Sequence, residues 1–149
     1  MKKIMPDEVK VDAIQHSPLL VVWKPEYNLG IPIVDEQHRG VVSTTNSFYY
    51  GIHSKHGESI LKPIVDMLYD YTYLHFEVEE DLLEQCKFPD VKHHHGLHSE
   101  LKDTLHEVGR ESVLHKDPYQ FMEFLKKWWI DHICDKDRVF RDHLVKTLK

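Results

Sequence analysis

Residues 59–85 read SILKPIVDMLYDYTYLHFEVEEDLLEQ, and this stretch decides the fold. Apolar residues recur every three or four positions along it, which predicts an amphipathic α-helix with one face turned to a core. The apolar stripe comprises Ile60, Ile64, Leu68, Tyr71, Val78 and Leu82. Pro63 is compatible with this helix because it lies near the first turn. His75 lies on the same stripe and Glu79 follows four residues later, so polar groups enter an otherwise apolar face.

Three further segments have the same periodicity, and we expect helices over residues 35–54, 91–112 and 118–145. The breaks between the helices are Lys55-His56-Gly57, Phe88-Pro89-Asp90 and Asp117-Pro118. The last break is an N-cap followed by a proline at the first helical position. Long amphipathic helices joined by short breaks predict an all-α fold, an up-down-up-down four-helix bundle. We expect residues 1–22 to form an extended N-terminal arm and residues 23–149 to form the bundle domain.

The composition argues against several classes of protein. The chain has 149 residues, 41% of them hydrophobic and 30% charged, which suits one globular domain. Its formal net charge of −6 argues against nucleic acid as a partner, and no apolar run is long enough for membrane insertion. Cys86 and Cys134 lie far apart and are interpreted as reduced thiols. Because no targeting segment is recognisable, we expect a cytoplasmic protein.

Histidine is unusually abundant, at 13 residues, and its placement indicates metal binding. Residues four apart on an α-helix differ by about 40° in direction, so their side chains can converge on one ion or on two adjacent ions. The candidate ligands are the pairs His75 with Glu79, His94 with His98 and His132 with Asp137, together with His38. The third pair is five residues apart, which corresponds to about 140°. Buried ionised groups without partners cost several kcal/mol each, and a metal site would supply the partners.

The number of candidate ligands indicates two metal ions. Seven ligands are too many for one tetrahedral zinc. Imidazole nitrogen with carboxylate oxygen suits iron, zinc, copper or manganese, so the residues alone leave the metal open. If both carboxylates and an oxo or hydroxo group bridge two six-coordinate ions, the ligands leave one position open on one metal. A small diatomic ligand requires such an open position.

The order and spacing of these residues resemble the haemerythrin family, in particular its bacterial members, over residues 22–144. The resemblance is carried by Trp23-x3-Tyr27-x-Leu29-Gly30-Ile31-x2-Val34-Asp35-x-Gln37-His38, His75-Phe76-x2-Glu79-Glu80-x-Leu82-Leu83, Phe88-Pro89-x4-His94-x3-His98 and Trp128-x3-His132-Ile133-x3-Asp137. It implies a cofactor of two iron ions (Fe2+/Fe3+) with a bridging oxo or hydroxo group. It also implies that dioxygen binds reversibly at one of the irons.

The resemblance assigns roles by position. One iron would be bound by His94, His98 and His132, and the other, with the open position, by His38 and His75. Glu79 and Asp137 would bridge the two irons. The apolar oxygen pocket over the open iron would have walls at Val41, Phe76, Trp128, Trp129 and Ile133. His95 is an alternative to His94 as the partner of His98, although only His94 lies centrally on the apolar stripe of its helix.

The resemblance implies a protein that binds dioxygen for storage, delivery or transport, and we expect no enzymatic activity. The alternative is an oxygen or redox sensor module of a signalling protein, because relatives often occur fused to signalling domains. A di-iron oxidase or peroxidase is less favoured, since no residue beyond the ligands suggests a substrate site. A zinc-filled structural bundle is the simplest competing interpretation. The sequence identifies no protein partner.

Overall fold

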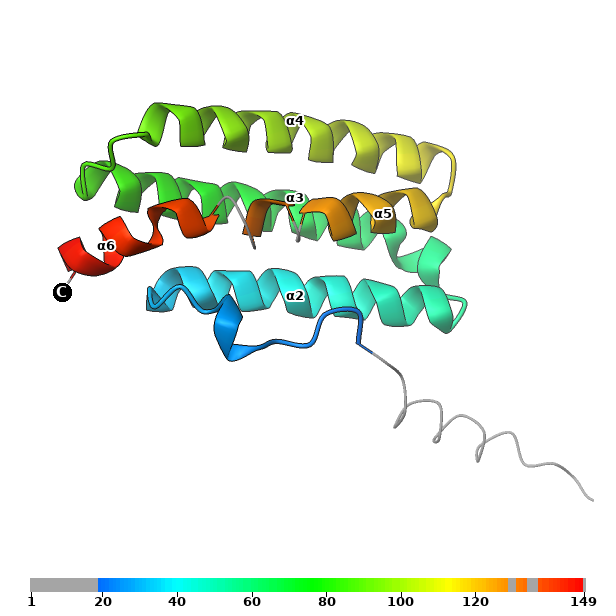
Figure 1. The fold of residues 1–149 in the computed structure, drawn as a ribbon. Coiled ribbons are helices and arrows are strands. Elements are labelled where there is room, and N and C mark those ends of the chain that lie inside the picture. The colour runs from blue at the N-terminus through cyan, green and yellow to red at the C-terminus, as the bar shows by residue number, and fades with distance from the viewer. Residues whose placement is uncertain (1–18, 129–130, 134–136, 149) are drawn as a thin grey trace, which may run out of the picture.

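The long helices begin and end close to the residues that the sequence predicts. The computed structural model describes residues 19–128, 131–133 and 137–148, and these ranges contain helices and no strands (Figure 1). After the short 3-10 helix η1 (Pro25–Tyr27) come α2 (Pro32–His53), α3 (Gly57–Gln85) and α4 (Val91–Leu114). Each begins and ends within three residues of the predicted bounds. The all-α fold class is confirmed.

The three corners between the long helices share one local structure. Each contains a lysine in the left-handed conformation, namely Lys55, Lys87 and Lys116, with φ of 65°, 53° and 52°. The amide after each lysine donates to the carbonyl five residues back, at 2.7, 3.0 and 2.8 Å. This is the Schellman arrangement, which satisfies the last carbonyls of a helix and turns the chain. Consecutive helices therefore run antiparallel (Figure 1).

The fourth helical segment differs from the prediction of one continuous helix over residues 118–145. Helix α5 (Pro118–Trp128) is followed by a π-helical turn at 131–133, the 3-10 helix η3 (Asp137–Phe140) and α6 (Arg141–Leu148). The two candidate ligands of this segment are five residues apart, a spacing that a regular α-helix places about 140° apart. A widened turn with i→i+5 hydrogen bonds suits that spacing, and such turns occur frequently at functional sites.

Residues 19–31, the described part of the chain before α2, lie against the bundle, and Asn46 binds Val21 there. The side-chain amide of Asn46 on α2 donates to the Val21 carbonyl at 2.8 Å, and its oxygen accepts from the Val21 N–H at 3.0 Å. Residues 1–18 of the predicted arm lie outside the described residues, so the division at residue 22 stays a prediction. None of the helices within the described ranges has the length and apolar character needed to cross a membrane.

Two apolar clusters occupy different levels of the bundle. The larger is built from all four long segments and includes Val41, Phe48, Leu61, Leu68, Phe76, Leu105, Phe121, Leu125, Trp128 and Ile133. The smaller joins the start of α2, the end of α3 and α6, and comprises Leu29, Ile31, Val34, Leu83, Cys86, Phe140 and Leu144. Along α2 and α3, the buried polar residues of the predicted site lie between the residues of the two clusters. The site is therefore a polar layer between two apolar ones.

Candidate metal centre

Six of the seven candidate ligands have described side chains, and all six are buried. They are His38 on α2, His75 and Glu79 on α3, His94 and His98 on α4, and His132 in the π-helical turn, none more than 4% exposed. The apolar stripes explain this placement, because each residue takes an inward position of its segment. For the seventh, Asp137, the structure describes only the backbone, as the first residue of η3, and its side chain lies outside the description.

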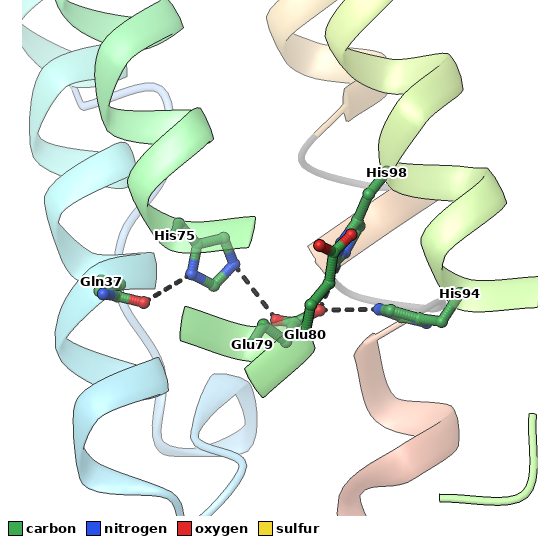
Figure 2. A network of polar contacts seen from close by, with 6 residues as sticks. All are labelled: Gln37, His75, Glu79, Glu80, His94 and His98. Carbon is green, nitrogen blue, oxygen red and sulfur yellow. Dashed lines mark hydrogen bonds and ion pairs between the residues drawn. The ribbon is translucent and has the colours of Figure 1, made fainter. Parts of the chain in front are cut away.

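Glu79 stands at the centre of the group, with its two oxygens facing different histidines. Its Oε2 lies 3.2 Å from His75 Nε2, while its Oε1 lies 2.7 Å from His94 Nε2 and 3.0 Å from His98 Nε2 (Figure 2). The side chains form two overlapping sets that share Glu79. One set is Glu79, His94, His98 and His132, and the other is His38, His75 and Glu79.

This donor set fits two metal ions. Within each set, the candidate ligand atoms all lie within 4.8 Å of one another. Ligands held at about 2.1 Å from one ion would be only slightly closer together than this. Imidazole nitrogens with a carboxylate oxygen are donors that suit iron among other transition metals. A carboxylate with one oxygen in each set has the arrangement of a bridging ligand.

The protonation state of His98 favours metal binding. Burial lowers the pKa of His98 below its ordinary value of 6.5, and the nearby Glu79 carboxylate opposes this by favouring the charged ring. The neighbouring rings of His132 and His94 lower the pKa further. A lowered pKa leaves the ring neutral at physiological pH, and the neutral imidazole is the form that binds a metal.

Two polar residues that the sequence analysis did not assign to the site contact it from outside. Gln37 accepts a hydrogen bond from His75 Nδ1 at 2.8 Å, and Glu80 accepts one from His98 Nδ1 at 3.1 Å. Each is the sequence neighbour of a candidate ligand. Their position next to a candidate ligand is the only feature of the sequence that points to them. It does not indicate that each accepts a hydrogen bond from a histidine on a different helix.

Aromatic rings enclose the three-histidine set. Phe76 stacks on His98 with centroids 3.8 Å apart and planes 2° from parallel. Trp128 lies parallel to His132 at 6.4 Å, and Phe140 presents an edge to His94 at 5.0 Å. The predicted pocket residues Val41, Phe76, Trp128 and Ile133 are all buried in the larger apolar cluster. Trp129, the fifth predicted wall, lies outside the described residues.

The structure separates His94 from its neighbours in the run of three histidines. His94 is buried and contacts Glu79, whereas His93 is exposed. His95 Nε2 lies 3.6 Å from Glu84 at the surface and belongs to neither ligand set. The alternative pairing of His95 with His98 therefore does not match the geometry. His143 contacts the Cys86 carbonyl at the end of the bundle, also outside the ligand sets.

Comparison with known proteins supports a metal-binding role for these residues. A family model described as the Hemerythrin HHE cation binding domain matches residues 29–144. The chain belongs to the haemerythrin family. It is 26% identical to a Bacteriohemerythrin of Stenotrophomonas maltophilia over 126 residues, covering 84% of this chain and 82% of the relative. It is 27% identical to a Bacteriohemerythrin of Clostridium acetobutylicum over 129 residues, covering 83% of this chain and 100% of the relative.

A eukaryotic relative extends the comparison. A Hemerythrin-like protein of Naegleria gruberi is 25% identical over 120 residues, covering 80% of this chain and 89% of that protein. The haemerythrin match includes every candidate ligand of the two sets. Membership of the family implies binding of non-haem iron, and the buried cluster of histidines around Glu79 fits that role.

Proposed function

We propose that this haemerythrin-family chain holds two irons and binds dioxygen reversibly. The observation that carries the proposal is the position of Glu79, whose two oxygens face two separate sets of histidines. One set offers three imidazoles and the other offers two, so a pair of similar ions would have unequal numbers of protein ligands. The ion held by His38 and His75 would keep a position for dioxygen.

The described residues bury the centre among apolar side chains. When bound, the irons supply the electrons that dioxygen needs for reversible binding. The protein's part is to exclude water, because protons from solvent favour irreversible oxidation over release of dioxygen. Phe76, Val41 and Ile133 are at most 3% exposed and present only apolar atoms at this level of the bundle. No catalytic turnover is part of the proposal.

A visible spectrum tests the function. The purified chain is reduced under anaerobic conditions and then exposed to air, and its metal content is measured in parallel. We expect iron, a charge-transfer band that appears in air, and bleaching of that band under vacuum over several cycles. A colourless protein that contains zinc would contradict the proposal. Continued production of hydrogen peroxide in the presence of added reductant would instead indicate an oxidase.

A sensor is the second candidate, and the placement of Phe140 favours it. Phe140 contacts the His94 ring and also belongs to the smaller apolar cluster with Leu144 of α6. A change in the ligand position of His94 would therefore reach the packing of α6. Hydrogen exchange of α6 amides, compared between reduced and oxygenated protein, separates the two functions. A sensor should show a change in α6 protection, whereas a simple carrier should not.

A further inference from the structure

Two histidines of the centre have their outer ring nitrogens bound by acceptors of different charge. His75 Nδ1 meets the amide oxygen of Gln37, and His98 Nδ1 meets a carboxylate oxygen of Glu80 (Figure 2). Gln37 reaches from α2 to α3, and Glu80 reaches from α3 to α4. Gln37 is 7% exposed and the Glu80 side chain 19%, so bulk water screens both contacts only weakly.

Both contacts favour the same tautomer. An amide oxygen and a carboxylate oxygen accept the hydrogen bond, so each contact favours a proton on Nδ1. The Glu79 carboxylate faces Nε2 of both rings and competes for that proton in the metal-free protein, whereas an ion bound at Nε2 would remove the competition. With the proton on Nδ1, the Nε2 atoms of His75 and His98 are free to bind an ion beside Glu79, whose oxygens lie 3.2 and 3.0 Å from them. This is the orientation in which an imidazole binds a metal, since the partner of the outer nitrogen selects the tautomer and the ring direction.

The two contacts differ in strength. A hydrogen bond to a carboxylate is charge-assisted and stronger than one to a neutral amide. It draws the Nδ1 proton outward and makes the ring a better electron donor at Nε2. His98 is therefore a stronger donor than His75. A stronger donor stabilises the higher oxidation state of the ion to which it binds.

We propose that Gln37 and Glu80 are positioning residues that make the two halves of the centre electronically unequal. The inference rests on the proposed di-iron function. Glu80 strengthens His98 and stabilises the oxidised state of the iron in the three-histidine set. Gln37 orients His75 without adding negative charge, so the iron with the open position is not driven further towards its oxidised state. The neutral amide at Gln37 therefore opposes return of an electron to the iron with the open position less than a carboxylate there would.

The first test uses the full-length, metal-free protein and does not depend on iron. Two-bond ¹H–¹⁵N correlation spectra report which nitrogen of each histidine carries the proton. We expect Nδ1 of His75 and of His98 to carry a proton, and Q37A or E80A to shift the proton of the matching ring alone towards Nε2, where Glu79 is the remaining acceptor. Q37E and E80Q should retain the proton on Nδ1. E84A is the matched control, because Glu84 contacts the surface residue His95.

The second test measures the reduction potential of the iron-loaded protein by spectroelectrochemistry. Q37E adds a carboxylate and should lower the potential, whereas E80Q removes one and should raise it. Q37A and E80A should weaken ferrous iron binding by about 10- to 100-fold, as loss of such outer partners typically does. A merely structural role would not shift the potentials in opposite directions. Equal shifts, or none, in Q37E and E80Q would overturn the inference.

The two tests distinguish failure of the inference from failure of the function. If the wild-type protein takes up iron but does not bind dioxygen, the function fails, while the opposite shifts in potential still support the inference. If it takes up only zinc, the tautomer spectra alone decide the positioning role. Mixed tautomers at both rings in a well-folded wild-type protein would refute that role, whatever metal is bound.

Discussion

At the residue scale, Glu79 is the side chain on which both ligand sets depend. Its oxygens lie 2.7 Å from His94 and 3.2 Å from His75, so its removal takes a ligand from each proposed iron. We expect E79A to bind one iron or none, and to lose the charge-transfer band in air. Iron analysis after anaerobic loading checks this. E77A is the matched control, because Glu77 is exposed on the same helix. Two tightly bound irons in E79A would contradict a bridging role.

Residues also differ in how far the sequence could place them. His38, His75, Glu79, His94, His98 and His132 could be selected because their spacing follows the apolar stripes of single helices. The choice of His94 over His95 rested on the same stripe. The contacts of Gln37 and Glu80 could not be predicted, because each joins two helices and depends on their rotation and separation. Helical periodicity contains no information about either quantity.

At the element scale, the long helices and the start of the fourth segment at Pro118 could be predicted, but the π-helical turn at 131–133 could not. The α2, α3 and α4 bounds follow from local signals, namely apolar periodicity and the breaks at the corners. In the fourth segment, Phe121 and Leu125 keep the same periodicity, yet a π-helical turn follows at 131–133. Local propensity favours the regular helix there. We attribute the change to the five-residue spacing of His132 and Asp137, which a regular helix places about 140° apart.

The segment before α2 is a second element whose position depends on one side chain. Val21 lines a cavity of about 430 Å³ with Thr45 and Leu125, and Asn46 supplies the two hydrogen bonds that hold it there. Removing these bonds leaves partly buried backbone groups unsatisfied, at a cost of about 1–3 kcal/mol. We expect N46A to accelerate hydrogen exchange of the Val21 amide by roughly tenfold or more.

The matched control for this prediction is S47A. Ser47 is exposed and its hydroxyl donates to the Ser43 carbonyl of its own helix, so S47A should leave exchange at Val21 unchanged. Exchange is measured at several pH values to confirm that it reports local opening. Unchanged protection of Val21 in a folded N46A protein would show that apolar contacts of the segment suffice to hold it.

At the scale of the whole molecule, the polar layer makes stability depend on the occupant of the site. Five buried imidazoles and a carboxylate separate two apolar clusters, and α2, α3 and α4 all contribute to the layer. A ligand that binds only the folded state adds to the free energy of unfolding. Metal loading should therefore stabilise the bundle as a whole, since the ligands join its helices.

The metal-free molecule should lose stability in mild acid, because the pKa of His98 is lowered in the folded state. Burial lowers its pKa in the folded state below 6.5, so between the two pKa values the unfolded state binds more protons. The free energy of unfolding then rises with pH across this window and falls as the pH drops from about 6.5 through the lower folded pKa. Bound metal competes with the proton, so the loaded protein should keep its stability to lower pH.

Urea unfolding of the metal-free protein at pH 8 and at mildly acidic pH measures how the free energy of unfolding changes with pH. We expect H98Q to reduce the pH dependence because glutamine cannot take up the proton. H106Q should preserve it, since His106 is exposed beside Tyr69. If H98Q retained the full slope, the acid sensitivity would originate elsewhere in the buried layer. If the metal-loaded protein lost stability over the same pH range, the ligand set would not be holding its metal through His98.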